Sequence, residues 1–435
     1  MTRSMHRRGL ALAGSVAVAA LLAAGCGNSG GGGGSSSPGI TDKTVKIGAH
    51  TPLTGPAAPG YSEIAPASKA FFAYVNAQGG INGRKIDYTY KDDGYNPTKT
   101  VSVTRELVLQ NKVFGIFNGL GTPTHTKVVD YLNTSKVPDL FVASGCPCWD
   151  DAKAHPYTFG WQTSYQIEGK ILGDYIKKHL AGKKVGVFYQ DDDFGQGGLT
   201  GLKEEIGDQI VAAKPYQPGD TNVAPQITAI QKAKADVLVD FTIPAYTALG
   251  QLVSFKVGYK PQLFISNVGA DPTTVGGLLK AFSKGKANTA LIEGAYTNGY
   301  LPSVNDTSNP WIALFKKIHD QYDAKAPFDG NVEYGMAAAY TFAAALKAAG
   351  NSPTRQGIVD AINAGKVAPG PGIVPFRYSA DDHGGFAGVQ MARISGGKIK
   401  LFGQPMITDP GSGPISAYTK PQQTPSDTGV IKTSS

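Results

Sequence analysis

The chain has 435 residues, 41% of them apolar and 17% charged, which fits two packed domains or lobes and excludes a fully disordered chain. The net charge of +8 is spread along the sequence in short pairs such as Lys183-Lys184, so a nucleic-acid-binding stripe is not expected. Three cysteines are too few for a disulfide scaffold, and only the N-terminus has an apolar run approaching the roughly 18 residues of a membrane-spanning helix.

The N-terminus has the three parts of an export signal. Arginines occur within the first eight residues, residues 10–24 are apolar, and Ala24-Gly25 precede Cys26. A basic start, a short apolar stretch and small residues before a cleavage point are typical of a secretory signal peptide. Because the cysteine follows Ala-Gly directly, the segment resembles a bacterial lipoprotein lipobox. We therefore expect residues 1–25 to be removed and Cys26 to carry a lipid, with an uncleaved anchor or an ordinary signal as alternatives.

Two segments of biased composition flank the body of the chain. Residues 26–42 are rich in Gly and Ser, which predicts a flexible tether. A lipid followed by a tether is typical of a domain that works beside a membrane without entering it. Residues 406–435 are rich in Pro, Ser, Thr and Gln, which predicts a low-complexity, disordered tail.

Predicted strands and helices alternate through the body. Ile86, Tyr88 and Tyr90 alternate with polar residues, which indicates a strand, and Gly79-Gly80 end the helix before it. The first series comprises strands at 44–49, 85–91, 113–117 and 140–143 and helices at 63–77, 97–110 and 122–133. The second comprises strands at 185–189, 237–241 and 263–266 and helices at 168–179, 197–207, 223–233 and 246–257. Helices at 311–322 and 332–349 and a strand pair near 388–401 follow.

This alternation predicts an α/β fold of parallel sheets covered by helices. Two such series predict two lobes. Open α/β sheets bind ligands beyond the carboxyl ends of their strands, so two facing lobes would place a ligand cleft between them.

The clearest local signal follows the strand at 113–117. Gly119 and Gly121 lead to Thr122, which we expect at a helix N-cap, with Pro123 in the first helical position. Gly121 would let a ligand approach the backbone, while free N–H groups, the helix dipole and the Thr hydroxyl would attract a carboxylate. The alternative is an ordinary capped helix. The glycine patterns of dinucleotide and phosphate loops are absent.

The strand at 140–143 is followed by Cys146 and Cys148. Such a pair can be a redox pair, half of a metal site or a small disulfide, and an exported protein favours the disulfide. A metal would need further ligands, and His155 is the only one nearby. We expect a disulfide and no metal, with free thiols as the alternative.

Aromatic residues at the ends of elements are further candidates for a pocket wall, although each alone is more often a packing residue: Tyr61, Tyr165, Phe194 and Tyr246. The run of three aspartates at 191–193 lacks the spacing of a Ca²⁺ loop and is interpreted as a solvated loop. Catalytic triads, nucleophile elbows and zinc-protease motifs are absent from the sequence, so neither an enzyme nor a cofactor is expected.

Five segments carry a family resemblance: Val45–Gly48, Pro52–Pro56, Val75–Ile86, Lys91–Asp93 with Asn96-Pro97, and Phe194–Gly197. Through them residues 43–405 resemble the leucine/isoleucine/valine-binding receptors of ABC importers, which are type I periplasmic binding proteins. The resemblance implies two α/β lobes joined by three crossovers, one built from 43–164 plus 298–373 and the other from 165–297 plus 374–405. It also implies that the ligand lies between the lobes and that closure buries it.

The family's ligand contacts are transferred by position. The hydroxyl that binds the ligand's carboxylate falls on Thr122, and backbone groups at the next strand end fall on Gly145 and Cys146. A second family hydroxyl falls on Pro147, which has neither a hydroxyl nor an N–H group. The aromatic walls fall on Phe194 and on or near Tyr246 and Tyr61.

One position departs from the family's amino-acid receptors. The glutamate that pairs the ligand's ammonium there falls on Val268, and valine cannot pair a buried cation. Asp271 or Glu333 would have to supply the charge from a different direction. Otherwise the ligand is a carboxylate without an amine or a neutral amide.

The expected function is that of an extracytoplasmic solute receptor for a small carboxylate-bearing ligand, namely a branched-chain or other amino acid or a related acid. Its expected partners are the permease and ATPase subunits of an ABC importer, and we expect a monomer attached to the membrane by its lipid alone. The alternatives are a receptor for aromatic or aliphatic acids or amides, a sensor of the same fold, an extracellular enzyme, and an adhesin or scaffold.

Overall fold

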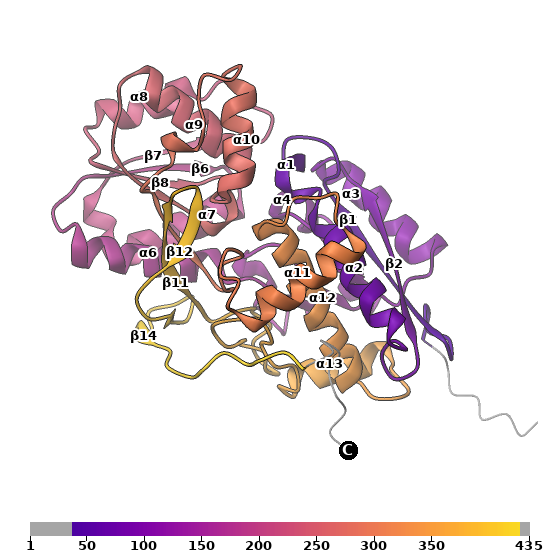
Figure 1. Ribbon diagram of the computed structural model, residues 1–435. Coiled ribbons are helices and arrows are strands. Elements are labelled where there is room, and N and C mark those ends of the chain that lie inside the picture. Colours follow the sequence, from indigo (N-terminus) through magenta and orange to yellow (C-terminus); the bar gives the residue numbers. More distant parts are fainter. Residues whose placement is uncertain (1–36, 427–435) are drawn as a thin grey trace, which may run out of the picture. The chain divides into compact units, whose positions relative to one another are not determined.

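The computed structural model describes residues 37–426 and places them around two β-sheets, each covered by helices (Figure 1). The predicted signal peptide, Cys26 and most of the tether lie outside the described residues. Among the helices described, none is long and apolar enough to cross a membrane.

The first sheet is fully parallel, with the strand order β2-β1-β3-β4-β5. Its strands are β1 (Thr44–Thr51), β2 (Lys85–Asp92), β3 (Gly115–Phe117), β4 (Asp139–Val142) and β5 (Thr158–Gly160). β3, β4 and β5 are buried along their whole length, as expected of parallel strands covered on both faces.

Helices from two distant parts of the chain cover this sheet. From the first part come α1 (Ala58–Tyr61), α2 (Ile64–Ala77), α3 (Pro97–Arg105), a π-helical turn (Glu106–Gln110), α4 (Thr122–His125) and α5 (Val129–Thr134). From the later part come α11 (Pro310–Tyr322), α12 (Gly330–Ala348) and α13 (Arg355–Asn363). α12 packs so closely on α2 that a Cβ at Gly335 would lie 2.3 Å from the carbonyl oxygen of Ile64.

The second sheet repeats the topology of the first. Its parallel strands have the order β7-β6-β8-β9-β10, so in both sheets the first strand lies between the second and the third. They are β6 (Val185–Gln190), β7 (Ile210–Tyr216), β8 (Val237–Phe241), β9 (Gln262–Ile265) and β10 (Tyr296–Gly299). β11 (Gly388–Ser395) joins β10 antiparallel and pairs in turn with β12 (Lys398–Leu401) and β13 (Met406–Ile407), and β14 (Ser416–Ala417) pairs with β13.

Glycines allow the helices of the second sheet to pack closely. The helices are α6 (Tyr165–His179), α7 (Asp193–Ile206), α8 (Ala224–Lys232), α9 (Pro244–Lys256) and α10 (Pro272–Phe282). A Cβ at Gly169 on α6 would lie 2.2 Å from the carbonyl oxygen of Gly198 on α7, and one at Gly201 would lie 2.0 Å from that of Gln166. The glycine-rich sequence of α7 is therefore a packing requirement.

The chain passes between the two sheets after β5, after β10 and after α13. β10 pairs with β9 and β11 and so lies entirely in the second sheet. The boundary expected between residues 297 and 298 divides this strand and is corrected to follow Gly299.

The tail prediction is wrong for residues 406–426. β13 and β14 extend the second sheet, and the buried Nζ of Lys170 on α6 donates to the carbonyl oxygens of Gly411 and Gly413. Further on, the indole of Trp311 on α11 donates to the carbonyl oxygen of Gln423, and the yellow segment in Figure 1 runs from β14 towards α13. Composition alone predicted disorder, because these backbone partners lie far away in the sequence.

Candidate functional site

A cavity of about 200 Å³ lies where the strand ends of the two sheets meet. From the first-sheet side it is lined by Leu120 and Gly121 after β3, by Ala143 after β4 and by the start of α12. From the second-sheet side it is lined by Asn267 after β9 and by the end of β10. The position agrees with the rule that open α/β sheets bind ligands beyond the carboxyl ends of their strands.

The structure brings seven of the predicted site residues to this cavity: Tyr61, Gly121, Thr122, Tyr165, Phe194, Asp271 and Glu333. Gly145, Cys146 and Tyr246 are not among the residues that line it.

Tyr246 is a packing residue instead. Its ring stacks on Tyr216 with centroids 3.9 Å apart, and its hydroxyl donates to the carbonyl oxygen of Asp220 at 3.1 Å and accepts from the amide of Gly219. The position expected to form an aromatic wall therefore supports the loop after β7.

Thr122 lies at the expected place with different helix geometry. Gly121, not Thr122, is the N-cap, with a left-handed φ of 106°, and Thr122 is the first residue of the four-residue helix α4. A helix of about one turn has little macrodipole, so an anion here would depend on local donors. The Thr122 and Ser144 hydroxyls are buried and lie 2.7 Å apart.

Tyr165 fills the space beside these hydroxyls. Its amide donates to the Gly145 carbonyl oxygen at 2.7 Å, and its ring would touch a Cβ at Gly145 at 3.0 Å. The hydroxyl of Tyr165 lies near the Gly145 amide and the Ser144 and Thr122 hydroxyls. Burial raises the pKa of Tyr165 to about 12, and these groups oppose the rise. The tyrosine hydroxyl thus lies beside the donor groups that the sequence assigned to a carboxylate.

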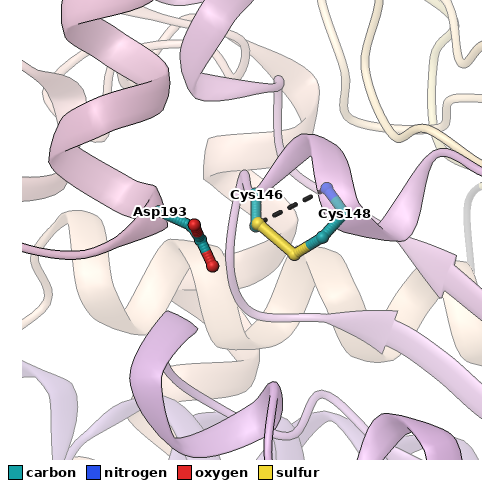
Figure 2. Close-up of side chains that lie close together, drawn as sticks. All are labelled: Cys146, Cys148 and Asp193. Atoms are coloured by element: carbon teal, nitrogen blue, oxygen red, sulfur yellow. Dashed lines mark hydrogen bonds between the residues drawn. A yellow bond between two sulfur atoms is a disulfide. The ribbon is translucent and has the colours of Figure 1, made fainter.

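Cys146 and Cys148 form a disulfide with an S–S distance of 2.09 Å, and Asp193 lies beside it (Figure 2). These three residues are the only cluster of potential metal ligands within residues 37–426, and the bonded sulfurs are not thiolates. Cys146 packs in a small apolar cluster with Trp149 rather than lining the cavity.

Acidic side chains form one wall of the cavity. Asp329 and Asp271 each use Oδ1 to cap a helix, Asp329 accepting from the amides of Asn331 and Val332 and Asp271 from that of Thr274. Glu333, in the first turn of α12, is 4% exposed, and its Oε1 has no hydrogen-bond partner. No Lys, Arg or His is among the described residues that line the cavity, so the wall is negatively charged or protonated.

Burial shifts the titration of these acids. Desolvation, followed by the charge of Asp271, raises the pKa of Asp329 to about 7. Desolvation and the nearby Asp329 raise the pKa of Glu333 well above its ordinary value.

The sequence analysis missed a group of polar residues at the ends of β9 and β10. The carboxylate of Glu168 on α6 is fully buried and accepts from the Ser266 hydroxyl, the Asn267 amide and the Asn298 side chain at 2.7–2.9 Å. It thereby fixes Asn267 and Asn298, which line the cavity. The Asn-Gly pair at 298–299 is the one signal that would have indicated a strand end there.

A second buried network lies behind the loop from Gly119 to Thr122. His50 Nδ1 lies 2.8 Å from Asp93 Oδ2, His50 Nε2 lies 2.8 Å from His125 Nδ1, and His125 Nε2 lies 2.7 Å from Asp139 Oδ2. Burial lowers the pKa of His50, while Asp93 opposes this shift. A Cβ at Gly119 would lie 2.7 Å from a nitrogen of each ring, so glycine is required where the network supports this loop.

The comparisons with known proteins identify the family. A family model described as "Periplasmic binding protein" matches residues 44–398. The chain belongs to the periplasmic binding protein family. This confirms the resemblance inferred from the sequence.

Named relatives and solved structures agree with this membership. Leu/Ile/Val-binding protein homolog 3 of Brucella melitensis is 24% identical over 331 residues, covering 74% of this chain and 84% of the relative. Leu/Ile/Val-binding protein homolog 7 of Brucella suis is 23% identical, and the match covers 80% of this chain and 88% of the relative. The fold matches a branched-chain amino acid ABC transporter protein of Thermus thermophilus with bound valine, with a TM-score of 0.74, 18% identity and coverage of 85% and 98%. It also matches a fatty acid ABC transporter substrate-binding protein of Thermomonospora curvata, with a TM-score of 0.73, 24% identity and coverage of 88% and 98%.

In this periplasmic binding protein the walls of the cavity are joined directly. The Tyr61 hydroxyl donates to the Val268 carbonyl oxygen at 2.6 Å, and the Asn331 side chain donates to the Thr274 hydroxyl at 3.1 Å. Val268 lines the cavity but offers no charge. Any charge complementary to a ligand cation must therefore come from elsewhere in the wall.

Proposed function

We propose that this periplasmic binding protein is an extracytoplasmic solute receptor that delivers a small ligand to the permease and ATPase subunits of an ABC importer. The observation that carries the proposal is the cavity, whose walls come from the strand ends of both sheets. A ligand that contacts both lobes favours the closed arrangement, and closure is then a population shift.

The ligand proposed first is an amino acid or a related small acid. Its carboxylate would bind to Thr122, Ser144 and the Gly145 amide, beside the Tyr165 hydroxyl. The names of the relatives in Brucella and the valine bound to the Thermus thermophilus protein support this class.

The second candidate is a receptor for a ligand that is not an amino acid, such as an aromatic or aliphatic acid or an amide. Val268, at the position of the family's ammonium-binding glutamate, favours it, as does the fatty acid receptor among the structural neighbours.

The remaining features of the proposal concern the chain outside the cavity. We propose a receptor and not an enzyme, acting as a monomer, with lobes that exchange chain after β5, after β10 and after α13. Cys26 would carry the lipid after removal of residues 1–25, and a Cys26→Ala variant would then leave the membrane fraction.

The experiment is a thermal-shift screen with amino acids, aromatic acids, short aliphatic acids and amides. A ligand at 100 times its Kd adds about 2.7 kcal/mol, which raises the melting temperature by a few degrees. Thr122→Ala should abolish the shift produced by carboxylate ligands, whereas Tyr246→Phe, outside the cavity, should preserve it. A folded protein that responds to no member of the panel would contradict the proposal and favour the scaffold alternative.

A further inference from the structure

The following inference rests on the proposed function and concerns what the cavity recognises. We infer that Glu333 receives a protonated amine of the ligand and thus supplies the charge that Val268 lacks. The preferred ligand class is then a primary amine or an amino acid, and a carboxylate without an amine binds more weakly.

Glu333 is an acid of the cavity wall that has a buried oxygen without a hydrogen-bond partner. It is buried, it lines the cavity, and its Oε1 has no hydrogen-bond partner. A buried carboxyl oxygen without a partner is costly, and at the wall of a cavity a ligand can complete its hydrogen bonds. An ammonium group offers three donors and a charge, which is the match for this oxygen.

The surrounding charges strengthen the preference for a cation. Asp329 is the N-cap of α12, the helix that carries Glu333. Asp271 and Glu63 are the N-caps of α10 and α2, and both raise the pKa of Asp329. Asp329 acts directly on Glu333, and Asp271, Asp329 and Glu333 all line the cavity without a base among the described lining residues, so this wall repels an anion and attracts a cation.

Aromatic rings line the same cavity. Tyr61, Tyr300, Phe328 and Tyr334 are all among its lining residues. The faces of such rings attract amines, and rings combined with acids are a favourable environment for a desolvated ammonium group.

Binding should therefore release a proton. Burial and the nearby Asp329 raise the pKa of Glu333 and so favour its protonated form in the empty cavity, and the O–H bond of that form must break when the carboxylate pairs with an ammonium group. The O–H electron pair stays on Glu333 and the proton passes to the buffer, so the amine keeps its own charge and atoms and charge balance. Proton release is measurable as a dependence of the binding enthalpy on the ionisation enthalpy of the buffer.

The test is calorimetric titration with two matched sets of probes. One set is leucine, isocaproate without the amine and isoamylamine without the carboxylate; the other is phenylalanine, hydrocinnamate and phenethylamine. We expect an amine-bearing probe to bind with proton release, and its deaminated partner to bind about ten- to hundredfold more weakly. Glu333→Gln should lose about ten- to hundredfold in affinity for the amine and lose the proton release. Glu205→Gln is the matched control, because Glu205 on α7 is a half-buried acid paired with Lys177 that does not line the cavity, and it should change neither.

The outcomes separate this inference from the proposed function. If isocaproate or hydrocinnamate binds as tightly as its amine-bearing partner, or if Glu333→Gln binds amines normally, the inference is wrong while the receptor function stands. If neither these probes nor any member of the thermal-shift panel binds, both fall together. Proton release by the wild-type protein is measured without any variant, so the inference can still be contradicted if the Glu333→Gln protein misfolds.

Discussion

At the scale of single residues, the chemistry of the cavity depends on which group forms hydrogen bonds with Thr122, Ser144 and the Gly145 amide. In the structure the Thr122 and Ser144 hydroxyls bond to each other, and the hydroxyl of Tyr165, whose ring packs against Gly145 and Phe194, lies beside them. A ligand carboxylate would compete with that hydroxyl for these donors. Tyr165 thus controls the strength of carboxylate binding.

Tyr165→Phe tests this competition. We expect the variant to bind leucine or isocaproate about fivefold more tightly, because removing a hydroxyl that competes for these donors is worth about 1 kcal/mol. Titration calorimetry measures the affinities, with Tyr246→Phe as the control tyrosine outside the cavity. Unchanged or weaker binding would mean that the carboxylate does not enter this group of donors.

Asp240 on β8 predicts a pH dependence of stability. Burial raises its pKa to about 8 although Gln251 donates to its Oδ2 at 3.0 Å, and Oδ1 has no partner. The folded protein therefore binds a proton that the unfolded chain lacks between the ordinary pKa of 3.8 and about 8. This contribution to stability is fully present below 3.8 and is lost as the pH rises through 8.

Asp240→Asn removes this titration. Its amide oxygen can accept from Gln251, and its NH₂ group takes the place of the unpaired oxygen. Relative to wild type, the variant should gain stability steadily between pH 5 and pH 8, as seen in urea unfolding at a series of pH values. A stability difference that is the same at both ends of this range would disprove the assignment.

At the scale of elements, the C-terminal segment acts as part of both lobes. β13 pairs with β11 in the second sheet, while the Gln422 side chain bonds to Asn309 before α11 and to the Pro371 carbonyl oxygen. Near the middle of this segment, the Gly411 and Gly413 carbonyl oxygens accept from Lys170 of α6, whose side chain is only 3% exposed. The segment is therefore a structural element that satisfies a buried cation.

Truncation after Thr408 should expose this dependence. We expect the free energy of unfolding to fall by about 3 kcal/mol, because the buried ammonium group of Lys170 loses two of its acceptors. Denaturant unfolding measures the loss. Lys170→Met should recover part of it in the truncated chain but destabilise the full chain, since only there are the acceptors present. Equal effects of Lys170→Met in both chains would contradict the coupling.

At the scale of the whole molecule, hydrogen bonds across the cavity favour the closed arrangement of the lobes. Tyr61 contacts Val268, Asn331 contacts Thr274, and the Gln190 side chain donates to the Tyr95 hydroxyl at 3.2 Å. Each of these bonds joins a residue on the first-sheet side to one on the second. Weakening them should shift the population towards open molecules.

Thr274→Val removes one such bond without altering a cavity-lining residue. We expect ligand affinity to fall about threefold to fivefold, because the closed state loses about 1 kcal/mol, and the radius of gyration without ligand to increase in X-ray scattering. Thr200→Val, exposed on α7, makes the same chemical change away from the cavity. Full affinity in the Thr274 variant would show that this bond does not contribute to closure.

The sequence by itself determined most of the elements, the family and the stretch around Thr122. These depend on local patterns: apolar periodicity, glycine and proline punctuation, and short motifs. It missed α1, β5, β7, β10, α10, α13, β13 and β14. β5 is only three residues long, and β7 is mostly half-buried and lacks a clear alternation of apolar residues.

Only the tertiary structure decided the contents of the cavity. Tyr165, Asn298 and Glu333 lie far apart in the sequence and meet because the chain passes between the sheets three times. The order of residues 406–426 has the same origin, since Lys170 and Trp311 supply their partners from distant helices. Patterns along the chain show which side chains are buried, whereas the hydrogen bonds that buried groups require are satisfied by whatever the fold brings near them.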